Sequence, residues 1–247
     1  QTPIIVANHM CYLDGFVLAA LFGAPKVLSK EGTKKMPLVG AFAEEIGVIE
    51  VKRDDKASRT ATMEAIREHV ERWTPGNRPM LLFPEGTTSN GDAILGFKKG
   101  AFVPGAPVRP VVLTYTGSWH PANTNFKTSN TGELEPTGDL EWAEQFLGHA
   151  VHSMQVRVLK PYEPNEVERA DPQLYANNVQ VVMSEAYEHL LVDVARRRQE
   201  KEQNSWQAQL QRATGRLISG VESAAALPAA ALGMGRTTEG RRTSGPR

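Results

Sequence analysis

The sequence is poor in cysteine and has no excess of charge of either sign. Cys11 is the only cysteine among 247 residues, which excludes an internal disulfide framework and a zinc site built from several cysteines. Lys and Arg together number 28, as do Asp and Glu, so the formal net charge is zero. That balance argues against a general nucleic-acid binder, which needs a basic excess. No apolar run approaches the roughly 20 residues of a membrane-spanning helix.

What is present is an ordinary globular composition. Hydrophobic residues make up 40% of the chain and there are 21 glycines, so full disorder and fibrous repeats are excluded. The length suits one large domain, or one domain with appendages. The chain begins at Gln1 and enters a strand-like run at once. We therefore expect a fragment of a longer protein, with any signal or membrane segment outside it.

Short apolar runs alternate with helical patterns over the first 190 or so residues. Most of the runs are continuously apolar, which is typical of strands covered on both faces. Together with the helices between them they predict an α/β fold, a mostly parallel sheet flanked by helices, followed by a C-terminal helix and a flexible tail. The expected strands are 3–7, 26–29, 48–52, 80–83, 108–115 and 154–159.

Two helices are indicated by periodicity and end signals. Residues 57–73 have apolar side chains at helical spacing, with Ser58 as the expected cap. A second helix is expected to begin at Asp171-Pro172, a cap followed by proline at the first helical position. Residues 123–138 are predicted to form a surface loop, because they are rich in Asn, Thr and Gly. One face of the second helix is expected to carry Val179, Val182, Met183, Ala186 and Leu190.

The composition changes after residue 191, so we predict three parts: a domain over 1–191, a helical extension over 192–223 and a disordered tail over 224–247. The extension is amphipathic and would rest on a membrane surface or on a missing part of the protein. The alternative is an ordinary helix that packs on its own domain or is solvated. The narrow apolar stripe consists of Trp206, Leu210, Ala213, Leu217 and Val221, flanked by Arg212 and Arg216.

A histidine and an aspartate follow the first strand. His9 and Asp14 lie five residues apart, directly before an apolar helix. They can form a pair only if the turn between them is not regular helix, since five helical steps would place them on diverging faces. The carboxylate would then fix the imidazole tautomer, and the other ring nitrogen could accept a proton. The alternative is a capping aspartate with a histidine packed against the sheet.

Two further strand ends carry polar groups. The strand at 80–83 runs into a turn with Glu85, Gly86 and Thr87, whose backbone N–H groups and hydroxyl suit a phosphate or hydroxyl substrate. Its alternative is a hairpin or capping turn. Arg53 follows the strand at 48–52 and could grip a phosphate, although most such arginines are merely solvated. Because parallel strands end at one edge of a sheet, a proton acceptor and an anion site would converge there.

The order of these motifs resembles the glycerolipid acyltransferase family, which includes lysophosphatidic acid acyltransferases. Four motifs follow one another in the order that this family has them. They are Asn-His-x4-Asp, residues 47–53, Phe-Pro-Glu-Gly-Thr and Val-Arg-Pro-Val-Val-Leu. Residues 83–92, 97–108 and 174–179 look like the lysophosphatidylcholine and lysophosphatidylethanolamine acyltransferases. The resemblance covers about residues 3–190. Cys11 stands where the family usually has Ser, and the family's preceding membrane helices and the calcium-binding hands of some members are absent from this chain.

The resemblance implies an enzyme that moves an acyl chain from acyl-CoA to the free glycerol hydroxyl of lysophosphatidylcholine or lysophosphatidylethanolamine. His9 would be the general base and Asp14 its orienting partner. Lys98 would meet a phosphate of coenzyme A. The head group and glycerol would be held by Arg53, Glu85, Gly86 and Thr87.

The resemblance also implies that acyl-CoA is a co-substrate and that no cofactor or metal is needed. The protein would act at a membrane, that of the endoplasmic reticulum, with its anchor before residue 1 and with no nucleic-acid partner. Alternatives are a lysophosphatidic acid or glycerol-3-phosphate acyltransferase, and a non-catalytic lipid or acyl-CoA binding domain. A metal-dependent hydrolase using His9, Asp14 and Glu85 has no second histidine at ligand spacing. Cys11 as an acyl-carrying nucleophile is a further alternative.

Overall fold

The fold is taken from a computed structural model of the chain. It describes residues 1–11, 13–30, 32, 40, 43–44, 48–51, 56–117, 120–124, 126–128 and 131–225. The chain divides into two compact units, Gln1–Val194 and Ala195–Arg247.

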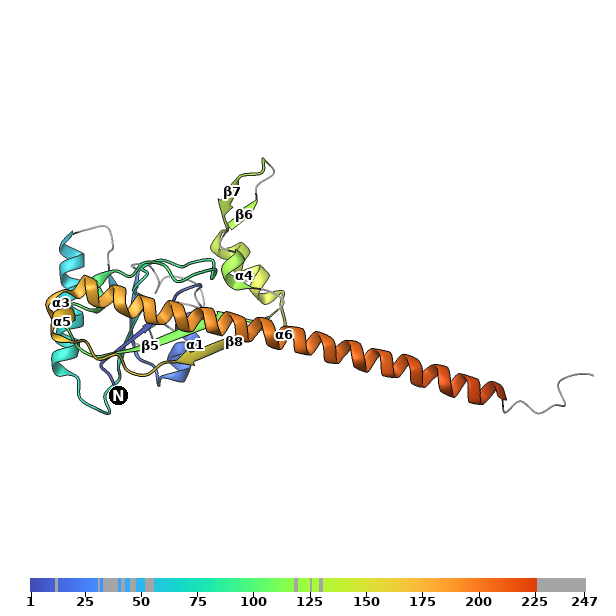
Figure 1. The fold of residues 1–247 in the computed structure, drawn as a ribbon. Coiled ribbons are helices and arrows are strands. Elements are labelled where there is room, and N and C mark those ends of the chain that lie inside the picture. The colour runs from blue at the N-terminus through green and yellow to red at the C-terminus, as the bar shows by residue number, and fades with distance from the viewer. Residues whose placement is uncertain are drawn as a thin grey trace, which may run out of the picture. The chain divides into compact units, whose positions relative to one another are not determined.

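A six-stranded sheet forms the centre of the first unit, with strand order β3-β2-β4-β1-β5-β8. All neighbouring strands are parallel except β8, which pairs antiparallel with β5. The mostly parallel α/β architecture and all six expected strands are thus confirmed. The antiparallel pair of β5 and β8 lies side by side in Figure 1. The strands are β1 Ile4–Ala7, β2 Lys26–Lys30, β3 Ile49–Val51, β4 Met80–Leu82, β5 Val108–Tyr115 and β8 Met154–Val158.

Both faces of the sheet are covered, which explains why the strands are continuously apolar. In β1, Ile4 and Val6 point to one face, which packs on α3 (Lys56–Arg72) and on the start of α6 (Pro172–Ala225). Ile5 and Ala7 point to the other, which packs on α1 (Leu13–Leu21) and α4 (Asp139–Leu147). Two cores, one on each side, therefore hold the central strands rigidly in register.

The helix expected at 57–73 is present, but its expected cap is wrong. The helix α3 begins at Lys56, so Ser58 lies inside its first turn. The expected start of the later helix is confirmed, because Asp171 Oδ1 accepts from the backbone N–H groups of Gln173 at 2.9 Å and Leu174 at 3.1 Å. On the expected apolar face of α6, Val182 is 37% exposed.

The region expected as a loop over 123–138 holds regular structure. The 3-10 helix η3 (Pro121–Thr124) is followed by β6 (Phe126–Thr128) and β7 (Leu134–Pro136), which pair antiparallel. Strands of three residues have too short an alternation to be recognised in a sequence rich in Asn, Thr and Gly. Among the described residues, the first unit also holds two short helices, η2 (Lys99–Ala101) and α5 (Glu166–Ala170).

The second unit begins inside α6, which is one continuous helix to Ala225 rather than two separate segments. Trp206 is 70% exposed. The side chains of the other residues of the expected stripe and of its flanking arginines lie outside the described part of the chain, as do residues 226–247. Among the helices that the structure describes, none combines the length and the apolar character needed to cross a membrane.

Candidate active site

The expected contact between His9 and Asp14 is present. His9 Nδ1 lies 2.9 Å from Asp14 Oδ2. The contact is possible because residues 8–10 are irregular and α1 starts only at Leu13. Asp14 therefore lies in the first turn of α1, whereas His9 precedes the helix. Since a carboxylate only accepts, Nδ1 carries the proton and Nε2 is left as the proton-accepting nitrogen.

The two side chains differ sharply in their exposure to solvent. The Asp14 side chain is fully buried, whereas 21% of the His9 side chain is exposed. The imidazole stacks on the ring of Phe83, with centroids 4.1 Å apart. No hydrogen bond joins Nε2 to any residue in the described ranges. The imidazole is therefore held in place on one edge and on one face, with its proton-accepting edge free for a ligand.

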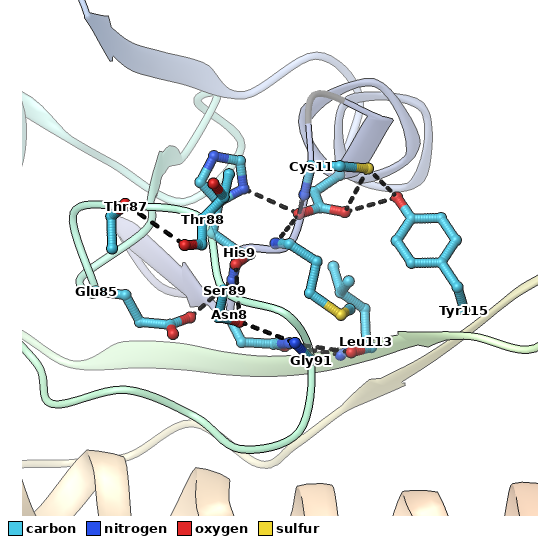
Figure 2. A network of polar contacts seen from close by, with 12 residues as sticks. Asn8, His9, Cys11, Glu85, Thr87, Thr88, Ser89, Gly91, Leu113 and Tyr115 are labelled. Carbon is cyan, nitrogen blue, oxygen red and sulfur yellow. Dashed lines mark hydrogen bonds and ion pairs between the residues drawn. The ribbon is translucent and has the colours of Figure 1, made fainter. Parts of the chain in front are cut away.

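Asp14 receives a dense set of donors (Figure 2). Its Oδ2 accepts from the backbone N–H groups of Met10 at 2.5 Å and Cys11 at 2.9 Å, besides His9. Its Oδ1 accepts from the Tyr115 hydroxyl at 2.7 Å, and the Cys11 thiol is 3.8 Å away. A buried charge surrounded by donors is stabilised as the charged form. Asp14 is thereby held in place facing His9.

Cys11 and Tyr115 lie behind Asp14, away from the imidazole. The Cys11 sulfur is 3.0 Å from the Tyr115 hydroxyl oxygen. Burial, followed by the charge of Asp14, raises the pKa of both the thiol and the phenol above their usual ranges. Both groups stay protonated, so a thiolate at Cys11 is disfavoured where the site would need a nucleophile.

Glu85 joins the turn after β4 to the turn after β1. Its Oε1 accepts from the His9 backbone N–H at 2.8 Å, and its Oε2 accepts from Leu95 N–H at 3.0 Å. Burial raises the pKa of this carboxyl group, while the two backbone hydrogen bonds oppose the change. A second link joins the same turns, because Ser89 N–H donates to the His9 carbonyl at 2.8 Å. Both Glu85 oxygens are thus engaged in holding the backbone around His9.

Asn8 fixes the other side of the same turn. Its side-chain amide donates to the Leu113 carbonyl at 3.0 Å, and its side-chain oxygen accepts from Leu113 N–H at 2.9 Å. The amide imitates one more residue of β1 against β5, just where β1 ends. This pair of bonds sets the point from which His9 leaves the sheet.

Gly86, Thr87 and Lys98 gather beside this turn. Gly86 has φ +70°, and Lys98 Nζ lies 2.5 Å from where a Cβ on Gly86 would stand. A side chain at Gly86 would therefore be strained and would displace the lysine. Thr87 and Lys98 are exposed. An ammonium group, a hydroxyl and a tight backbone turn suit a phosphate group.

Arg53, which was expected at the same edge, lies outside the described residues. The strand before it, β3, is at the edge of the sheet, separated from β1 by β2 and β4. The ends of β1 and β4 are neighbours, because Val6 pairs with Leu82. The structure therefore brings His9, Asp14, Glu85, Gly86, Thr87 and Lys98 to one place. In the described ranges no three His, Cys, Asp or Glu side chains are grouped as metal ligands.

The sequence did not predict the contact of Tyr115 with Asp14. It also did not predict that Asn8 and Ser89 hold the backbone around His9. Tyr115 is 101 residues from Asp14, and only the pairing of β5 with β1 brings the two together. The available signal was a tyrosine at the carboxyl end of an expected strand, the position where parallel strands carry functional side chains.

The chain is similar to proteins of one enzyme class, the acyltransferases. Residues 1–114 match the family model described as Acyltransferase. Human lysophospholipid acyltransferase LPCAT4 is 37% identical over 189 residues, covering 75% of this chain and 34% of the relative. Arabidopsis thaliana lysophospholipid acyltransferase LPEAT1 is 35% identical over 187 residues, covering 73% and 43%. Human lysophosphatidylcholine acyltransferase 1 is 33% identical over 184 residues, covering 74% and 32%.

The chain spans only about a third to two fifths of the length of these relatives. Among solved structures, the 1-acyl-sn-glycerophosphate (LPA) acyltransferase PlsC from Thermotoga maritima is similar, with a TM-score of 0.49 and 20% identity over 77% of this chain and 66% of that one.

Proposed function

We propose that the chain transfers an acyl group from acyl-CoA to the free glycerol hydroxyl of a lysophospholipid, lysophosphatidylcholine or lysophosphatidylethanolamine. The observation that carries the proposal is the His9–Asp14 pair, a partly exposed imidazole 2.9 Å from a fully buried carboxylate. The family model that residues 1–114 match supports the same class of reaction, and the names of the relatives support the same acceptor.

The chemistry follows from the free ring nitrogen. His9 Nε2 removes the proton of the acceptor hydroxyl while its oxygen attacks the carbonyl carbon of the thioester. The carbon–sulfur bond then breaks, and the coenzyme A thiolate takes the proton back from the imidazolium. Asp14 stabilises the imidazolium between the two steps, because its charge lies against Nδ1. The products are the acylated phospholipid and coenzyme A.

The anionic parts of the substrates are assigned to the turn beside His9. Gly86 and Thr87, together with Arg53, would hold the head group and glycerol, and Lys98 would meet a phosphate of coenzyme A. The contact of Lys98 with the Gly86 turn supports an anion site there. Glu85 has both oxygens engaged by backbone N–H groups, so its part in binding is to hold the Gly86 turn against His9.

The wider assignments follow from this reaction. Residues 1–191 would form the acyltransferase domain and 192–223 a helical extension. The reaction as written takes acyl-CoA as a co-substrate and uses no cofactor. Because the acceptor is a lipid, the protein would work at a membrane, that of the endoplasmic reticulum, in phospholipid synthesis and remodelling.

The test is an assay with radiolabelled acyl-CoA and a panel of acceptors, with and without a chelator. We expect chelator-insensitive acylation of lysophosphatidylcholine or lysophosphatidylethanolamine. Transfer confined to lysophosphatidic acid or glycerol-3-phosphate would replace the proposed acceptor. Saturable binding of acyl-CoA with no transfer to any acceptor would indicate a non-catalytic domain, and chelator-sensitive hydrolysis would indicate a metal-dependent hydrolase.

A further inference from the structure

The buried side of Asp14 holds two groups that the reaction does not use directly. Tyr115, at the end of β5, donates its hydroxyl proton to Asp14 Oδ1 over 2.7 Å. Cys11 lies 3.0 Å from the same hydroxyl oxygen. Figure 2 shows the Cys11 sulfur next to the Tyr115 hydroxyl. Both groups face Asp14 Oδ1, whereas His9 contacts Oδ2. Tyr115 is only 6% exposed and Cys11 2%, so solvent does not replace either contact.

The chemistry of the carboxylate fixes the direction of the hydrogen bond between Tyr115 and Asp14. A carboxylate only accepts, so the Tyr115 hydroxyl donates its one proton to Asp14. The hydroxyl oxygen is then left to accept. It lies 3.0 Å from the Cys11 sulfur, whereas Asp14 Oδ1 lies 3.8 Å from that sulfur, so the hydroxyl oxygen is the nearer acceptor for the thiol proton. The chain of bonds therefore runs from Cys11 through Tyr115 to Asp14, and it ends on the carboxylate from the side opposite His9.

We propose that Tyr115 is a positioning residue that sets the orientation of Asp14 and the proton affinity of His9, with Cys11 as the donor that orients Tyr115. The inference rests on the proposed function of the His9–Asp14 pair. Three donors converge on Asp14 Oδ2, whereas the Tyr115 hydroxyl is the closest donor to Oδ1 in the described part of the chain. Without it, the carboxylate loses the contact that draws part of its charge away from the imidazole.

The sign of the effect follows from that charge. A carboxylate that gives up a donor on Oδ1 concentrates more negative charge on Oδ2, beside His9. It then stabilises the imidazolium more strongly, so removing the Tyr115 hydroxyl raises the pKa of His9. The other titratable groups that interact with the pair, among the residues described, are Glu85, His120 and Tyr187. A Tyr115 substitution leaves all three in place.

The experiment is Tyr115→Phe, compared with Tyr175→Phe as the matched control. Phenylalanine keeps the ring, and therefore the packing, while removing the hydroxyl. Tyr175 is fully buried and donates to the Ala106 carbonyl at 2.9 Å, so its variant loses a comparable bond away from Asp14. Two readouts are taken: the pH dependence of kcat/KM, and the NMR titration of labelled imidazoles with His9 assigned by comparison with His9→Asn.

We expect Tyr115→Phe to lower kcat about tenfold with little change in KM. We expect the acid limb of kcat/KM and the pKa of His9 to move upward together by about half to one pH unit. Tyr175→Phe should move neither. A His9 pKa that is the same in Tyr115→Phe and wild type would overturn the inference, whatever the loss of activity. If the wild-type chain transfers no acyl group, the NMR titration still decides on Tyr115, and only the proposed function fails.

Cys11→Ala provides the second variant, used if Tyr115→Phe melts too low to be titrated. It removes the donor to the Tyr115 hydroxyl and leaves the Tyr115–Asp14 bond in place. We expect a smaller upward shift of the His9 pKa, because Asp14 loses a part of the same chain of bonds. No shift, or a downward shift, in this variant would overturn the inference in that case.

Discussion

Glu85 is the residue whose geometry changes its expected role most. Its sequence position after β4 suggested direct contact with substrate, yet both oxygens accept from backbone N–H groups, one of them that of His9. A residue that holds the base in place affects kcat, whereas one that binds the acceptor affects KM. These two roles can be separated by kinetics.

We expect Glu85→Gln to lower kcat by about tenfold or more and to leave the KM for the lysophospholipid nearly unchanged. A glutamine keeps one accepting oxygen but sets an NH₂ group against a backbone N–H. One of the two turns therefore loses its hydrogen bond to this side chain. The measurement is steady-state transfer at varied acceptor concentration. A raised KM with unchanged kcat would instead indicate that Glu85 binds the acceptor directly.

Cys11 gives a prediction of reactivity. Burial raises the pKa of its thiol, and its sulfur is engaged by Tyr115, so we expect the folded chain to react with iodoacetamide at least about a hundredfold more slowly than the denatured chain. Mass spectrometry is unambiguous because there is no other cysteine in the sequence. Similar rates for the folded and denatured chains would contradict this prediction and would support the alternative in which the Cys11 thiol carries the acyl group.

The contact of His9 with Asp14 could be predicted from the sequence because it is local. The two residues are five apart, and one irregular turn is enough to join them. The bonds from Glu85 to His9 and from Tyr115 to Asp14 cross 76 and 101 residues. They depend on strand order and register, which a single sequence does not contain, so they became visible only in the fold.

At the scale of elements, the short helix α5 is held by an unusually complete cap. Asn165 and Glu168 form a reciprocal capping box, and Glu168 also accepts from Tyr162 and Asn178. Burial opposes the charge of Glu168, but these hydrogen bonds together lower its pKa. A lowered carboxyl pKa stabilises the fold above the unfolded-state pKa, and this contribution is lost as the pH falls through the folded-state value.

We expect Glu168→Gln to lower the free energy of unfolding by about 1–2 kcal/mol at pH 7. The difference from wild type should shrink as the pH falls below the unfolded-state pKa of about 4.3 toward the lower folded-state pKa of Glu168, because the unfolded chain takes up the proton first. Denaturant unfolding at several pH values measures this. Glu166→Gln, on an exposed side chain of the same turn, is the control. A difference that stays constant down to pH 3 would contradict the account of Glu168.

The strands were predicted correctly because a sheet covered on both faces requires continuous apolar runs, as in β1 and β5. The β6–β7 hairpin was missed because three-residue strands have almost no periodicity. Helix α6 was expected as two segments because its composition changes after residue 191. It continues because residues 192–214 contain neither glycine nor proline, and helix propensity does not depend on apolar content.

At the scale of the whole molecule, the parallel sheet explains how distant motifs meet. The strands β1 and β4 run side by side in the same direction, so the turns that carry His9 and Glu85 leave the sheet at one edge. The two cores on either side of the sheet keep these strands in register. The site therefore draws its rigidity from the sheet, although its residues lie in turns.

The helical extension over 192–223 keeps its predicted membrane role as a hypothesis that truncation can test. We expect a chain that ends at Val194 to bind anionic vesicles more than about tenfold more weakly than one that ends at Ala224, since each basic residue near an anionic surface contributes about 1 kcal/mol. Ending at Val194 retains the Arg157–Asp193 ion pair of the first unit. Equal binding to vesicles would refute the membrane role, and a lower melting temperature of the shorter chain would favour packing on the domain.

The central claim is that His9 acts as the base for acyl transfer, and the turnover of His9→Ala tests it most directly. Its imidazole is held on Nδ1 by Asp14 and stacked on Phe83, so its removal should leave the buried network largely intact. A positioned base contributes about 10²–10⁴ in rate, and we expect a loss of that size with an unchanged circular dichroism spectrum. Turnover above about a tenth of the wild-type value in a folded variant would contradict the claim.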